Sequence, residues 1–112
     1  MRFLALVLCL AWTVGAFAQG QKVYEGREAL ALRCANTLAL TAVALARADL
    51  ISPLEEDIML DVTFQILQRH VSGTWLQKKR AMEIMRDRRS VPDTLEDYRN
   101  NAARCLQQFP IN

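Results

Sequence analysis

The sequence has few of the side chains from which catalytic and metal sites are built. It contains one histidine, His70, and three cysteines, which is too few for a zinc site if the cysteines are oxidised. The acidic residues Glu55, Glu56, Asp57 and Asp61 lack the glycine-punctuated loop of a calcium site. Ser72 and Thr74 are near His70 in sequence, but no acid partner accompanies them in a triad arrangement, and an enzyme that uses His70 with a carboxylate is only a minor alternative. We therefore expect no metal, no cofactor and no enzymatic activity.

The sequence also lacks a strong excess of charge. Its 14 Lys and Arg residues face 12 Asp and Glu residues, a net charge of +2, which falls to +1 if Arg2 is removed with a signal peptide. This balance argues against non-specific nucleic-acid binding. No stretch shows the sustained alternation of apolar and polar residues that predicts a β-strand. The fold class that remains is all-α.

Residues 1–18 have the pattern of a secretory signal peptide that is cleaved. Arg2 precedes an apolar stretch at residues 3–14. The small residues Ala16 and Ala18 stand at positions −3 and −1 of a signal-peptidase cleavage site after Ala18. The apolar stretch is shorter than the roughly 20 residues that span a bilayer. We expect one helical domain over residues 19–112, in the periplasm or secreted from the cell.

Removal of the signal peptide leaves two cysteines, Cys34 and Cys105, because Cys9 lies within it. An even number of cysteines in an exported chain implies a disulfide bond. The wide spacing of the pair differs from the CxxC motif of redox-active dithiols, so we expect a structural bond. Such a bond closes a loop of about seventy residues, which the chain-entropy model values at roughly 4 kcal/mol.

Four stretches have the features of helices: residues 25–49, 53–72, 75–89, and the stretch from 90–93 to Pro110. The first is apolar on nearly every side, which is typical of a buried or a membrane-bound helix. Charges at both ends, with Asn36 and Thr37 inside, favour burial as the central helix. In the second, Leu54, Ile58, Val62 and Ile66 form one apolar stripe.

Local signals mark where the second and third helices begin and end. Ser52 and Glu55 form one capping box, and Thr74 and Gln77 form another. Gly73 is expected to stop the second helix. The links between helices are short, which favours antiparallel neighbours. The sequence predicts a small four-helix bundle stapled by a disulfide bond between Cys34 and Cys105.

The third helix has the most suggestive surface. Its basic residues at positions 78, 79, 86 and 89 are expected to share one side, and Trp75 stands at the head of this run. Tryptophan and arginine are enriched in binding hot spots. The alternative interpretation of the basic side is an ordinary solvated helix face. For His70, the alternative to partner binding is a helix-capping or surface role. The candidate partner-binding residues are Trp75, Lys78, Lys79, Arg86, Arg89 and His70.

These features favour a non-enzymatic exported protein that binds another envelope or secreted protein through the surface of its second and third helices. Contact of the basic face with an anionic membrane surface is a related interpretation. One alternative is a small-ligand or lipid-binding bundle, with a pocket between the first helix and Met82 and Met85, because methionine lines adaptable apolar cavities. Another is a periplasmic stress chaperone, although no stretch matches a chaperone motif.

Overall fold

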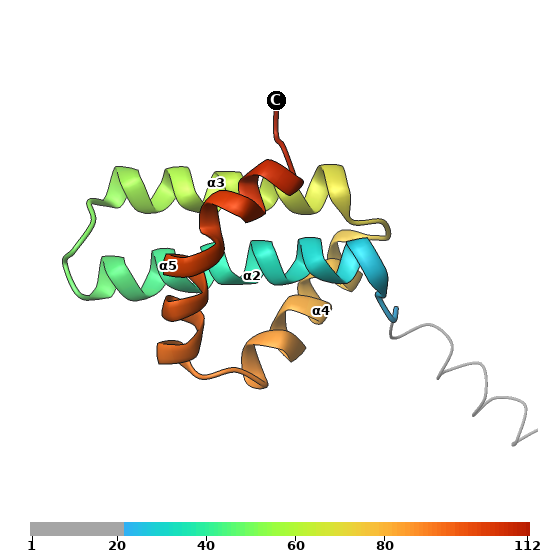
Figure 1. The fold of residues 1–112 in the computed structure, drawn as a ribbon, viewed down its shortest axis with the longest axis horizontal. Helices are drawn as coiled ribbons and strands as arrows, with labels where there is room; N and C mark the ends of the chain where they lie inside the picture. Colours follow the sequence, from blue (N-terminus) through green and yellow to red (C-terminus); the bar gives the residue numbers. More distant parts are fainter. Residues whose placement is uncertain (1–21) are drawn as a thin grey trace, which may run out of the picture.

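The computed structural model describes residues 22–112. The predicted signal peptide, residues 1–18, lies outside the described residues. The described part contains four helices and no strand (Figure 1): α2 (Gly26–Arg47), α3 (Pro53–His70), α4 (Trp75–Asp87) and α5 (Val91–Gln108). The predicted all-α fold with four helices is confirmed.

Both predicted capping boxes are present. The Ser52 hydroxyl accepts a hydrogen bond from the Glu55 amide at 3.1 Å, and the Glu55 carboxylate accepts one from the Ser52 amide at 3.2 Å. Thr74 and Gln77 make the same pair of bonds at the start of α4. Each box satisfies amide groups that have no partner inside the helix. The starts of α3 and α4 are therefore fixed by local sequence.

The helix ends differ by a few residues from the expected bounds. The first helix ends at Arg47, because the chain turns through Asp49, whose φ of +55° is left-handed. Helix α3 ends at His70 and is followed by Gly73, whose φ of +96° suits glycine alone among common residues. A Cβ at that position would also lie 2.6 Å from the end of the Gln77 side chain, which would have to move.

Helix α2 is the centre of the fold, because each of the other three helices packs against it. Helices α2 and α3 form an antiparallel pair, whereas α5 crosses α2 obliquely and α4 diverges from it toward its C-terminal end (Figure 1). Three alanines of α2, Ala31, Ala35 and Ala42, have no exposed surface. Small side chains at these positions allow neighbouring helices to approach closely, as expected for a spine.

By length and composition alone, α2 could cross a membrane, but the core helix of a folded domain passes the same test. Half of its most apolar window is buried inside the protein. Its buried residues include the polar Asn36, Thr37 and Thr41. In this structure α2 is the core helix of the domain, as the sequence favoured.

The predicted disulfide bond is confirmed. It joins Cys34 in α2 to Cys105 in α5, with 5.6 Å between the Cα atoms and a sequence separation of 71. The bond holds the crossing point of the central and last helices. A structural disulfide fits a protein exported to an oxidising compartment.

A second tie fixes the C-terminal end of α5 against α2 and α3. Phe109 is 1% exposed; the His70 ring meets it edge-on, with 5.4 Å between centroids. The guanidinium of Arg27 lies 4.9 Å from the centre of the Phe109 ring, a cation–π distance. His70 Nε2 also donates a hydrogen bond to the Pro110 carbonyl at 2.8 Å. The only histidine of the chain therefore helps to hold the C-terminal segment.

Candidate functional site

An exposed aromatic pair lies between α3 and α4. The rings of Phe64 and Trp75 are 5.4 Å apart and tilted by 59°, within the preferred range for aromatic pairs. Phe64 is 47% exposed and Trp75 is 51% exposed, although both are large and apolar. A shallow hollow of about 410 Å³ lies beside them, lined by Phe64, Gln68, Trp75 and Lys78. We call these four residues, with Leu60 one turn before Phe64, the α3–α4 face.

Two of the predicted basic residues, Lys78 and Arg89, have head groups that bond to partners within the protein. The Lys78 ammonium donates to the carbonyl oxygen of Leu67, in the last turn of α3, at 3.0 Å. That carbonyl has no partner within its own helix, so Lys78 caps α3 while its stem lines the hollow. Arg89 is largely covered and hydrogen-bonds to Asp97 and Thr37.

The other predicted residues of the third helix remain outside. Trp75, Lys79 and Arg86 are all exposed, and their spacing of four and seven residues places them along one side of α4. Arg86 makes one ion pair, 3.4 Å long, with the adjacent Asp87. The four basic residues expected on one side therefore fall into two pairs. The head groups of Lys78 and Arg89 bond to partners within the protein. Lys79 and Arg86 are exposed and follow Trp75 along the same side of α4.

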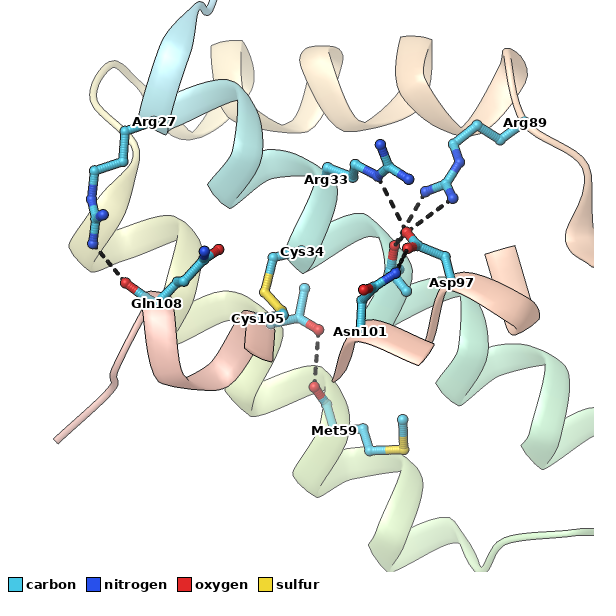
Figure 2. The surroundings of a disulfide bond; sticks show 11 residues. Arg27, Arg33, Cys34, Met59, Arg89, Asp97, Asn101, Cys105 and Gln108 are labelled. Atoms are coloured by element: carbon cyan, nitrogen blue, oxygen red, sulfur yellow. Dashed lines mark hydrogen bonds and ion pairs between the residues drawn. A yellow bond between two sulfur atoms is a disulfide. The ribbon is translucent and has the colours of Figure 1, made fainter. Parts of the chain in front are cut away.

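The charged cluster around Asp97 joins α2, α5 and the link between α4 and α5. Figure 2 shows Arg33 and Arg89 pointing toward the Asp97 carboxylate, at 3.2 and 3.0 Å. Asn101 donates a further bond at 2.7 Å, and the Thr37 hydroxyl donates one at 3.1 Å. Burial raises the pKa of Asp97, but the hydrogen bonds from Asn101, Arg33 and Arg89 outweigh it and lower the pKa to about 2. The cluster stabilises the ionised form of Asp97, and through it holds α5 and the preceding link against α2. We call it the Asp97 clamp.

A larger groove lies on another side of α4, where it diverges from α2. Its volume is about 650 Å³, within the range of roughly 300–1,000 Å³ that is typical of small-ligand sites. Met82 and Met85 both pack against the core, but only Met85 also lines this groove. The groove shares no lining residue with the hollow beside Phe64 and Trp75.

Sequence reasoning missed two residues that organise these sites. By its spacing Phe64 belongs to an apolar stripe with Leu60, and its pairing with Trp75 depends on how α4 folds back. Asp97 gave no signal beyond its charge, because its contacts with Arg33, 64 residues away, and with Arg89, in the link before α5, depend on how the helices pack. A clue to Phe64 was available: the capping boxes place the start of α4 close after the end of α3.

Within residues 22–112, no three His, Cys, Asp or Glu side chains come close enough together to hold a metal ion. The chain matches no protein-family model, and comparisons with characterised proteins and with solved structures find no match either. The following proposal therefore depends on the geometry of the α3–α4 face.

Proposed function

We propose that this protein is an exported, non-enzymatic binding protein that uses the α3–α4 face to dock another envelope or secreted protein. It acts in the periplasm or outside the cell. The observation that carries the proposal is the aromatic pair, Phe64 and Trp75, half-exposed beside an apolar hollow. Exposed aromatic side chains in a hollow are typical anchors of protein interfaces.

Charge near this pair indicates the chemistry of the partner. Lys79 follows Trp75 by one helical turn, and Arg86 follows Lys79 by two. Both are exposed. A partner segment with an apolar side chain for the hollow and acidic residues beside it would match this arrangement. The cations would speed association and fix the register, while the aromatic pair would supply most of the affinity.

The test is capture of the partner from an extract of the cells that make the protein. The full exported chain, with its disulfide bond intact, is immobilised as wild type and as the variant Phe64→Ala/Trp75→Ala. Truncation of two hot-spot residues is expected to reduce the captured partner at least about tenfold. A charge-reversed variant, Lys79→Glu/Arg86→Glu, is expected to slow association and to weaken its dependence on salt.

The matched control is Leu54→Ala/Ile58→Ala. These side chains are exposed apolar residues of the same helix, at 68% and 55%, but they lie on another side of α3. This control should capture as much partner as wild type. If the two alanine pairs lose the partner equally, or if neither does, the α3–α4 face is not the docking surface.

A further inference from the structure

The groove between α2 and α4 combines an apolar floor with a cationic rim. The floor includes Leu32 from α2 and Ala81, Ile84 and Met85 from α4. The rim carries five cations: Lys22, Arg33, Arg80, Arg88 and Arg89. No carboxylate side chain lines the groove anywhere in the described part of the chain. The groove is therefore strongly positive, although the net charge of the whole protein is small.

Internal ion pairs leave part of this positive charge without a partner. Arg33 and Arg89 share the single carboxylate of Asp97. Arg80 lies 3.6 Å from Glu83. Arg88 is exposed and forms no ion pair with any residue in the range 22–112. Positive charge is therefore in excess where Arg33, Arg88 and Arg89 line the same groove, because these three guanidinium groups have only the Asp97 carboxylate to balance them.

We propose that the groove binds a free single-chain fatty acid. The carboxylate lies near the guanidinium groups of Arg88, which has no ion pair in the described residues, and of Arg33, whose contact with Asp97 uses only Nε; both can donate charge-assisted hydrogen bonds to it. The acyl chain lies over Leu32, Ile84 and Met85, where methionine allows chains of different length to fit. This proposal goes beyond protein docking and uses different residues, so either can fail without the other.

The geometry favours a monomeric ligand over a membrane surface. The apolar side chains line a recess between two helices, together with the five cations. A peripheral membrane site would instead present its apolar side chains outward to the lipid. A groove of about 650 Å³ lies within the volume range of small-ligand sites and suits one chain.

The test is isothermal titration of the oxidised, full exported chain with sodium dodecanoate below its micelle concentration. We expect saturable binding of one molecule per chain. Dodecylamine, which has the same chain length and the opposite head charge, should bind at least about tenfold more weakly. Arg88→Glu should weaken dodecanoate binding by about tenfold. The control Arg99→Glu, an exposed arginine of α5 outside the groove, should bind within twofold of wild type.

Each other outcome overturns the proposal. Absence of saturable dodecanoate binding, or equal binding of dodecylamine, would show that the groove does not recognise a fatty acid. Flotation with phosphatidylglycerol vesicles, without dodecanoate binding, would identify the cationic rim as a membrane contact. Competition by a poly-glutamate peptide as strong as that by dodecanoate would show that charge alone is recognised. Circular dichroism and thermal melting of Arg88→Glu serve as the control for folding: the variant should match wild type in both, so that loss of binding is distinguished from loss of structure.

Discussion

The guanidinium of Arg89 lies 3.0 Å from the carboxylate of Asp97, and the same guanidinium donates to the Thr37 hydroxyl at 3.2 Å. Arg89 precedes α5, whereas Thr37 belongs to the central helix. This contact therefore fixes the start of α5, and with it the link from α4, against α2. A residue that the sequence indicated for partner binding is held in the interior instead. Its first role is to position the helices that border the groove.

Replacement of Asp97 by asparagine should destabilise the fold. Arg89 would lose a charged acceptor in a site that is largely closed to water, and Arg33 would lose the same acceptor at a more exposed site. Hydrogen bonds to charged groups contribute roughly 1.5–3 kcal/mol each, and exposed ion pairs much less. We expect the free energy of unfolding to fall by about 2 kcal/mol, measured by urea denaturation at pH 7. No change would contradict the proposed clamp.

The same carboxylate should make stability depend on pH. Its pKa is lowered from 3.8 to about 2 in the folded protein, so the stabilisation is complete above pH 4 and is lost as pH falls toward 2. The size of this contribution is roughly 2 kcal/mol. The stability difference between wild type and Asp97→Asn should therefore shrink between pH 4 and pH 2. A difference that stays constant across this range would contradict the lowered pKa.

Reduction of the Cys34–Cys105 bond should lower the melting temperature. The bond spans 71 residues, and disulfides of this kind typically contribute about 2–4 kcal/mol. For a domain of this size that corresponds to a decrease of roughly 10 °C or more. The variant Cys34→Ala/Cys105→Ala should melt like the reduced wild type and should not respond to reductant. Equal melting of oxidised and reduced wild type would contradict a stabilising bond.

Thr41 offers a stabilising substitution. Its side chain is 1% exposed, and its hydroxyl has no hydrogen-bond partner in the described part of the chain. A buried hydroxyl without a partner costs free energy, whereas a methyl group of the same size does not. Thr41→Val should therefore raise the free energy of unfolding by roughly 1 kcal/mol. A decrease would mean that the hydroxyl is hydrogen-bonded in solution.

Helix α4 should be the least stable helix of the domain. It has no fully buried residue, and α2 is the helix against which it mainly packs. Segments with few buried apolar contacts open at lower free energy than the rest of a fold. In native-state hydrogen exchange, the amides of α4 should be less protected than those of α2 around Ala35. Equal protection of the two helices would show that α4 is part of the same cooperative core.

The features that the sequence predicted well depend on local or chemical signals. The starts of α3 and α4 follow from Ser52, Thr74 and their partners three residues later, which act within one helical turn. The disulfide follows from cysteine number and cellular compartment. Each of these signals can be evaluated without knowledge of how the helices pack.

The features that it did not predict depend on tertiary placement. Leu54 and Ile58 continue the apolar stripe of Ile66, yet both are largely exposed. The packing partner expected for them is absent in the described residues, because α5 crosses α2 and does not run along α3. In the same way, periodicity gave the spacing of the basic residues of α4. Periodicity could not predict that Lys78 bonds to the last turn of α3 or that Arg89 forms an ion pair with Asp97.

The most direct test of the central claim is site-specific photo-crosslinking in the cells that make the protein. A photo-reactive amino acid is placed at Lys79, beside the aromatic pair, and at Asn100, an exposed position on α5. The account predicts a covalent adduct with one partner protein at position 79 and none at position 100, and loss of the adduct when Trp75 is replaced by alanine. No adduct at position 79, or the same adduct at both positions, would contradict the claim that the α3–α4 face is the docking surface.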